Sequence, residues 1–184
     1  MFFNRQKNEL KVLKKQYQEV REKEMVQRKE IRELRDKEKE LNFLKGLLKQ
    51  YTILGVEKNK LDVEYYVCLS ISEDTFDLYL KSAFTRRHPV PRLFGTIHPR
   101  SSMNNIGKCK IDDMNAVNEN EGNGSILLDY AKKYLKSIGI RYIYGDLSSV
   151  DKDKFGKLEK FYMKNSFEVT FNEERTSGRI KINI

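Results

Sequence analysis

The sequence contains few cysteines and histidines, and it has no long uninterrupted apolar segment. Cys68 and Cys109 have no partner motif, which argues against a disulfide framework and favours buried thiols in a reducing compartment. His88 and His98 lack a second ligand at metal-binding spacing, so we expect no metal site. No apolar run approaches the ~20 residues that span a bilayer, and the first residues lack the apolar core of a signal peptide. These absences lead us to expect a soluble cytoplasmic protein with no membrane partner.

Positive charge is concentrated at the start of the chain. The 184 residues carry a formal net charge of +9, and residues 1–50 hold 15 Lys and Arg against 9 Asp and Glu. The remaining residues hold 21 Lys and Arg against 18 Asp and Glu. Attraction to nucleic acid would therefore begin in the first segment. A nucleic-acid partner is the weaker expectation, because no aromatic residues that could stack on bases alternate with the basic ones.

The first segment is also poor in the residues that interrupt helices. Residues 4–50 contain no proline and one glycine, Gly46, and good helix formers dominate them. Counted in sevens from Phe3, nine of the fourteen a and d positions are apolar, which predicts a long helix with an interrupted apolar seam. So narrow a stripe needs a partner. We expect residues 3–48 to form a coiled coil, first of all as a homodimer. Packing on the chain's own domain or docking to another protein remain alternatives.

Beyond residue 50 the apolar period shortens to about two residues, which is typical of strands. Residues 51–61 read as a helix exit and a linker. The predicted strands cover residues 63–71, 75–83, 92–98, 108–114, 141–146, 167–171 and 179–184. The predicted helices cover residues 125–137 and 154–165. The chain should therefore combine a basic coiled-coil helix, residues 1–50, with an α+β domain, residues 62–184.

Two motifs lie on either side of the strand predicted at residues 141–146. Residues 119–128 read ENEGNGSILL, and residues 158–167 read LEKFYMKNSF. Glycines before an apolar helix suit a loop whose amides, with the positive end of the helix dipole, hold a phosphate. An ordinary helix-capping turn is the alternative interpretation of the glycines. With the closing hairpin, the two motifs resemble the GNAT superfamily of N-acetyltransferases, whose pyrophosphate loop reads Gln/Arg-x-x-Gly-x-Gly/Ala and whose later helix bears Phe/Leu-Tyr-x-x-x-Gly-Phe. The resemblance extends from about residue 62 to residue 184.

This resemblance implies a GNAT-like mixed sheet with flanking helices, which binds acetyl-CoA and moves its acetyl group to an unspecified amine. Tyr162 matches the family tyrosine that protonates the departing thiolate, and a half-buried aromatic residue of an amphipathic helix is the alternative interpretation. A general base is expected among Asp113, its neighbour Asp112, and Asp146, each of which could instead be an ordinary solvated carboxylate. The implied cofactor-binding positions are Met114, Ala116, Gly122, Asn123, Gly124, Ser125, Ile126 and Phe155.

Two carboxylates are unexpected beside a pyrophosphate. Glu119 stands where the family has Gln or Arg, and Glu121 follows it. Each would weaken cofactor binding by on the order of 1 kcal/mol if its charge faced the phosphates. We therefore expect both to point away or to pair with a lysine, for which Lys108, Lys110 and Lys152 are the candidates.

Other positions also depart from the family pattern. Phe155 stands where the family often has an Asn that holds the pantetheine amide, and Ser166 replaces a Gly. The two helices that the family places after its first strand have no counterpart between residues 63 and 83. The alternative function is therefore a catalytically silent GNAT-like module that binds a protein or nucleic-acid partner through its N-terminal helix.

Overall fold

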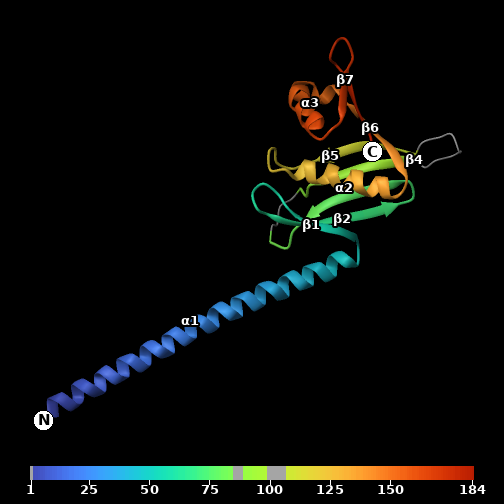
Figure 1. Ribbon diagram of the computed structural model, residues 1–184. Coiled ribbons are helices and arrows are strands. Elements are labelled where there is room, and N and C mark those ends of the chain that lie inside the picture. Colours follow the sequence, from blue (N-terminus) through green and yellow to red (C-terminus); the bar gives the residue numbers. More distant parts are fainter. Residues whose placement is uncertain (1, 85–88, 99–106) are drawn as a thin grey trace. The chain divides into compact units, whose positions relative to one another are not determined.

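The chain forms two compact units, Met1–Lys45 and Gly46–Ile184. The computed structural model describes residues 2–84, 89–98 and 107–184, with side chains from Glu9 onward. His88 and the side chains of seam residues Phe3 and Gln6 therefore lie outside the described residues. Figure 1 shows the elements of both units in sequence order of colour.

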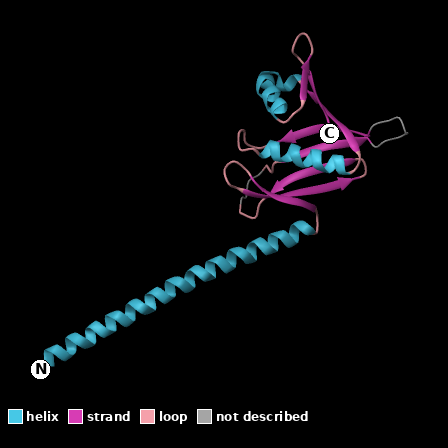
Figure 2. Ribbon diagram, in the orientation of Figure 1, coloured by secondary structure: helices cyan, strands magenta, loops and turns pink. Residues whose placement is uncertain are grey.

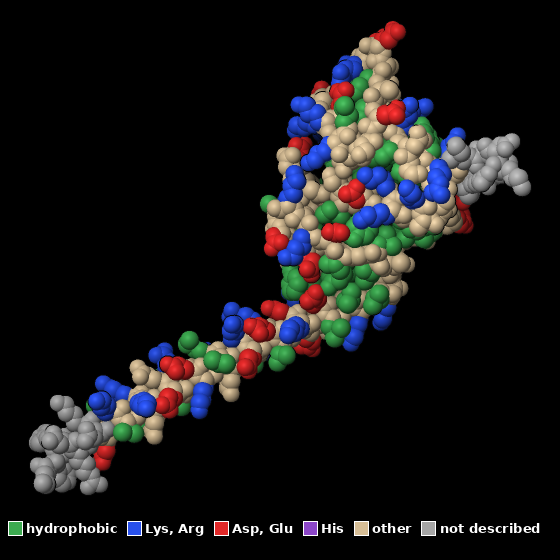
Figure 3. Space-filling model, in the orientation of Figure 1, with side chains coloured by type: hydrophobic (Ala, Val, Ile, Leu, Met, Phe, Trp, Pro, Cys, Tyr) green, Lys and Arg blue, Asp and Glu red, His purple; other side chains and the backbone are tan. Residues whose placement is uncertain are grey.

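The N-terminal segment is one continuous helix, α1 (Phe2–Leu48), in agreement with its lack of proline. Ion pairs one turn apart follow its surface and support the helix. They join Lys15 to Glu19, Glu24 to Arg28, and Lys29 to Glu33, each at 4.0 Å. Hydrophobic side chains lie exposed between these charges along α1 (Figure 3).

The second unit is built on one mixed sheet. Its strands are β1 (Thr52–Lys58), β2 (Glu64–Ser72), β3 (Thr75–Lys81), β4 (Arg92–His98), β5 (Gly107–Asn115), β6 (Ile140–Leu147), β7 (Glu168–Phe171) and β8 (Gly178–Asn183). Among the described residues their order across the sheet is β1-β2-β3-β4-β5-β6-β8-β7. The pair β5–β6 is parallel, and the other neighbouring pairs are antiparallel. The predicted α+β class, a mixed sheet with flanking helices preceded by a long helix, is confirmed.

The strand β1 corrects the sequence analysis, which expected only a helix exit and linker over residues 51–61. β1 pairs with β2 from Thr52 opposite Leu69 to Lys58 opposite Glu64. The register shifts between Ile53 and Gly55, and this bulge interrupts the alternation of apolar and polar residues by which strands are recognised in a sequence. The ring of Tyr130 occupies the space above Gly55: a Cβ there would lie 2.2 Å from the Tyr130 hydroxyl oxygen.

In the described part of this unit the helical segments are α2 (Asn123–Ser137), the 3-10 helix η1 (Ser149–Lys154) and α3 (Phe155–Lys164). α2 lies across one face of the sheet (Figure 2). Its buried residues, Leu127, Leu128, Ala131 and Leu135, belong to the same core as Phe76, Leu78 and Leu80 of β3. Full burial of each large aliphatic side chain contributes about 1.5–3 kcal/mol. The core therefore fixes α2 on the sheet.

Among the helices of the described residues, none combines the length and the apolar composition that a bilayer crossing requires.

The two cysteines should be chemically inert in the native protein. Both are fully buried, and burial raises the pKa of Cys68 to about 11 and that of Cys109 to about 12. Since the thiolate is the reacting species, we expect Ellman's reagent at pH 8 to label them about a hundredfold or more slowly than in the unfolded chain. Absorbance in native buffer and in guanidinium measures both rates. Full labelling of the native chain at the unfolded rate would contradict this burial.

Candidate functional site

The sheet opens between β5 and β6. Their parallel pairing runs from Gly107 opposite Ile140 to Ile111 opposite Gly145 and ends there, although β5 continues to Asn115. Beyond that point β5 stays paired with β4, and β6 stays paired with β8. A bulge between β4 and β5, at Gly95, accompanies the divergence. The end of β5 is therefore splayed from β6, and on that side its backbone groups have no partner strand among the described residues.

The loop after β5 leads to the N-terminus of α2. Gly122 caps the helix with a φ of 88°, a conformation that glycine adopts without steric cost. The amide of Ile126 donates to the carbonyl of Gly122 at 3.2 Å and so closes the first helical turn. The amides of residues 123–125 therefore have no carbonyl one turn earlier in the helix. Val117 has a φ of 68°, which is strained for a β-branched residue and must be held by its surroundings.

A buried hydrogen-bond network holds this loop. Asn123 is 1% exposed, and its Nδ2 donates to the Ala116 carbonyl and to Glu121 Oε2, both at 3.3 Å. Its Oδ1 accepts from Asn59 Nδ2 at 3.1 Å. Asn118 Nδ2 donates to Glu121 Oε1 at 2.9 Å. The Glu121 carboxylate thus points into the protein, and the side chain of Asn123 holds the loop together.

Lysines that the sequence analysis did not associate with the loop lie beside it. Glu119 pairs with Lys157 of α3 at 3.0 Å, and with none of the three lysines considered above. The amide of Lys60, in the β1–β2 turn, donates to the Glu121 carbonyl at 2.9 Å. The Cγ of Lys60 lies 3.3 Å from the position of a Cβ on Gly122, so this exposed side chain runs along the loop. Nothing in the spacing of the sequence indicates this contact.

Gly124 has a packing role. A Cβ at this position would lie 2.9 Å from Cζ of Phe161 and 3.5 Å from Cβ of Ala116. α2 and α3 therefore approach each other here, and glycine is required whether or not an anion binds. Ser125 and Ile126, in the first turn of α2, are half-buried.

Two other predicted cofactor residues belong to the core. Phe155 is 3% exposed and packs on Phe171 with ring centroids 4.9 Å apart. It offers no polar group to a pantetheine amide, in contrast to the family Asn. Met114 lies opposite Leu93 of β4, and its side chain packs against the core. Met114 can therefore take part in binding through its backbone, on the splayed part of β5.

Tyr162 lies in an aromatic cluster of α3. Its ring is 6% exposed and makes edge contacts with Phe161 at 5.1 Å and Phe167 at 5.7 Å between centroids. Burial, and then the charges of Asp151 and Asp113, raise its pKa to about 12. Tyr162 is therefore protonated at neutral pH, and it lies within electrostatic reach of Asp113 on the splayed strand.

The candidate bases differ in their surroundings. Asp146 pairs with Lys110 at 3.2 Å and with Arg179 at 3.4 Å. Burial favours a higher pKa for Asp146, but the hydrogen bonds and charges of Lys110 and Arg179 outweigh it and lower the pKa. Asp112 lies 3.9 Å from Lys110. Asp113 is exposed and makes no hydrogen bond or ion pair with the described residues, so it is the least constrained of the three. Across the whole described part of the chain, no group of three or more His, Cys, Asp or Glu side chains could hold a metal ion.

The helices expected on the acceptor side in the family are absent from the described part of this chain between β2 and β3. β2 ends at Ser72 and β3 begins at Thr75, and the Thr75 hydroxyl donates to the Ser72 carbonyl at 2.9 Å. The turn between them leaves no room for a helix, as the sequence indicates.

Comparisons with known proteins find similarity at low sequence identity. No family model matches the chain. Protein YocC of Bacillus subtilis (strain 168), described as uncharacterized, is 26% identical over 165 residues, which cover 85% of this chain and 96% of YocC. The GNAT domain of S. lividans PAT has a TM-score of 0.44 at 12% identity, over 60% of this chain and 61% of that one. Nourseothricin acetyltransferase has a TM-score of 0.43 at 10% identity, over 73% of this chain and 84% of that one. The strand order and the single parallel pair β5–β6 of the described residues agree with the mixed sheet predicted from the sequence.

The packing role of Gly124 can be tested against a second helical glycine. Gly124→Val should lower the free energy of unfolding by about 1–3 kcal/mol, because the new side chain overlaps Phe161. A Cβ on Gly156, in α3, would have no other atom within 4 Å, so Gly156→Val should change this free energy by less than about 1 kcal/mol. Urea denaturation measures both values. Equal effects would show that α2 and α3 do not meet at Gly124.

Proposed function

We propose that residues 46–184 form a GNAT-like N-acetyltransferase domain, which takes an acetyl group from acetyl-CoA and transfers it to an amine. One observation carries the proposal: β5 leaves β6 directly before the loop that leads to the N-terminus of α2. A splayed strand can bind an extended amide chain such as pantetheine in the way that it would bind a neighbouring strand. The amides at the start of α2 suit a pyrophosphate.

The residues around the loop fit this cofactor. The backbone amides of Gly124 and Ser125 lie at the positive end of the α2 dipole. Lys60 adds an exposed positive charge beside Gly122. Of the two carboxylates, Glu119 is paired with Lys157, and Glu121 is turned into the hydrogen-bond network. The repulsion expected from the sequence is therefore reduced.

When bound, acetyl-CoA would supply an acetyl group activated as a thioester. The chain's part begins with Asp113, an exposed carboxylate on the splayed strand, which accepts the proton that an ammonium must lose before it attacks. Backbone amides of β5 near Met114 stabilise negative charge on the acetyl oxygen. Tyr162 directs a hydrogen bond to the departing sulfur. Its pKa of about 12 exceeds the ~8.5 of an ordinary thiol, so Tyr162 supports departure by hydrogen bonding more than by full proton transfer.

Binding of the cofactor can be tested without knowledge of the acceptor. Acetyl-CoA at 100 times its Kd should stabilise the chain by about 2.7 kcal/mol, which a thermal-shift titration detects. Ser125→Asp should abolish the shift, because it places a charge at the anion site while a carboxylate in the first turn favours the helix itself. Ser125→Asn, the neutral control, should retain it. An unchanged melting temperature at millimolar acetyl-CoA would refute the cofactor and support the silent module that acts through its N-terminal helix.

The role of Tyr162 is testable once any amine in a panel of polyamines and lysine peptides is acetylated. Tyr162→Phe should preserve the acetyl-CoA thermal shift and the aromatic packing, but reduce kcat by about 10–100-fold. Because the pKa of Tyr162 is about 12, the wild-type rate should show no loss from tyrosine ionisation below about pH 10. Release of the CoA thiol measures the rate. An unchanged kcat in Tyr162→Phe would remove this residue from the mechanism.

A further inference from the structure

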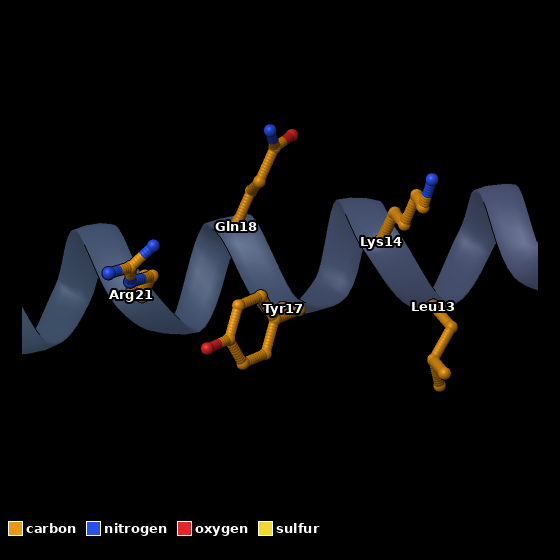
Figure 4. A pocket seen from close by; sticks show the side chains of 5 residues that line it. All are labelled: Leu13, Lys14, Tyr17, Gln18 and Arg21. Atoms are coloured by element: carbon orange, nitrogen blue, oxygen red, sulfur yellow. The ribbon is translucent and has the colours of Figure 1, made fainter.

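The described residues of the unit Met1–Lys45 do not cover the apolar seam of α1. The seam consists of the a and d positions of the heptads that begin at Leu10, and its apolar side chains are about half exposed or more. These are Leu10, Leu13, Tyr17, Val20, Ile31, Leu34, Leu41 and Leu48. Figure 4 shows the local geometry: Leu13 and Tyr17 project from one side of the helix, whereas Lys14 and Gln18 point away from it. So much exposed apolar surface on a single helix requires a covering partner.

We propose that this partner is α1 of a second copy, parallel and in register, so that the chain is a two-stranded coiled-coil dimer. In this arrangement each a residue meets the same a residue of the other copy, and d meets d. A g side chain reaches the e side chain five residues later in the other copy and crosses over the a layer between them. Each a layer can therefore be examined together with the charges beside it.

Two of the apolar a layers have attractive charge pairs beside them, whereas Tyr17 has Gln16 and Arg21 there. Leu10 and Ile31 are apolar a residues of the described seam. Each would be flanked on both sides by a glutamate of one copy and a cation of the other, which stabilises the parallel pairing. The pairs are Glu9 with Lys14 of the second copy, and Glu30 with Arg35 of the second copy.

The acidic a layers have the opposite surroundings. Glu24 would face Glu24 of the second copy, with Lys23 and Arg28 of both copies around them. Within one helix, Arg28 Nη2 already lies 4.0 Å from Glu24 Oε2. Glu38 is likewise preceded by Lys37 in the adjoining g position. In the proposed dimer the acidic residues that interrupt the seam therefore have cations on both sides, which the two copies contribute together.

The charges also exclude the reverse orientation. In an antiparallel pair, e positions face e positions. The e positions of α1 from Lys14 to Arg35 are all cationic, so two rows of like charge would meet. They are Lys14, Arg21, Arg28 and Arg35. An acidic helix of another protein would neutralise this row of cations, but it would add negative charge beside Glu24 and Glu38. The pattern as a whole is complementary to itself.

Cysteine crosslinking of the full chain tests orientation and register. In the proposed dimer, Leu13→Cys brings two thiols together at a d position, and oxidation should yield a covalent species of two chains. Lys29→Cys, at an outward f position, is the matched control and should remain uncrosslinked. The native thiols do not interfere, since both are buried. Sedimentation should give the mass of two chains. A monomeric or trimeric mass, or a Leu13→Cys chain that fails to crosslink with itself, would overturn the proposal.

Reversing the charge of Glu24 tests whether the surrounding cations, Lys23 and Arg28, stabilise the dimer at this layer. Glu24→Lys gathers like charges in the seam and should raise the Kd of the dimer by at least about tenfold. Glu22→Lys makes the same change at an outward f position and should alter the Kd less than about twofold. Adding Lys23→Glu and Arg28→Glu to Glu24→Lys reverses every charge of the layer and should restore the dimer. Circular dichroism verifies that each variant remains helical. Equal effects of Glu22→Lys and Glu24→Lys, or no rescue, would refute the matched layer.

Discussion

The arrangement of the second unit depends on the point where β5 leaves β6. A parallel pair cannot be joined by a tight turn, so the chain must cross over through α2 to return as β6. The crossover places the N-terminus of α2 near the carboxyl end of β5, where the pairing ends. Because β4 and β8 hold the outer edges of the two strands, the opening is part of the folded sheet. The parallel β5–β6 pair, with its crossover through α2, thus produces both an open strand edge and a set of helix amides beside it.

The loop between β5 and α2 is stabilised by polar contacts. A buried carboxylate is costly unless its oxygens are hydrogen-bonded. Asn118 and Asn123 provide these bonds to Glu121, and Asn59 in turn holds Asn123. The network fixes the loop through the Ala116 carbonyl, directly before Val117, whose positive φ its surroundings must hold. A preorganised anion site needs such rigidity, since binding then orders little of the chain.

Much of this fold follows from short-range patterns. Alternation of apolar residues located β2 to β6, and the two motifs located α2 and α3, because burial on one face imposes those periods. β1 was missed because its bulge at Gly55 interrupts the alternation. The partner of Glu119 was predicted wrongly, since ion pairs between distant elements depend on packing that no spacing encodes. Lys60 and the contact of Gly124 with Phe161 are likewise products of tertiary structure.

The cofactor side and the acceptor side of the candidate site are formed by different parts of the second unit. Every residue assigned to the cofactor lies in the second unit, from the β1–β2 turn to α3, so binding of acetyl-CoA would not depend on the dimer. On the acceptor side the described chain between β2 and β3 supplies no helix, and side chains of the sheet remain. Arg92 there is held by Asp77 and lies over the rings of Tyr79 and Phe94. Since Phe76 of the same strand contacts Tyr134 of α2, alternation places Asp77 and Tyr79 on the opposite face of the sheet. The face opposite α2 therefore carries a fixed cation–aromatic surface, whereas the family resemblance implies acceptor-side helices that the described chain between β2 and β3 does not have.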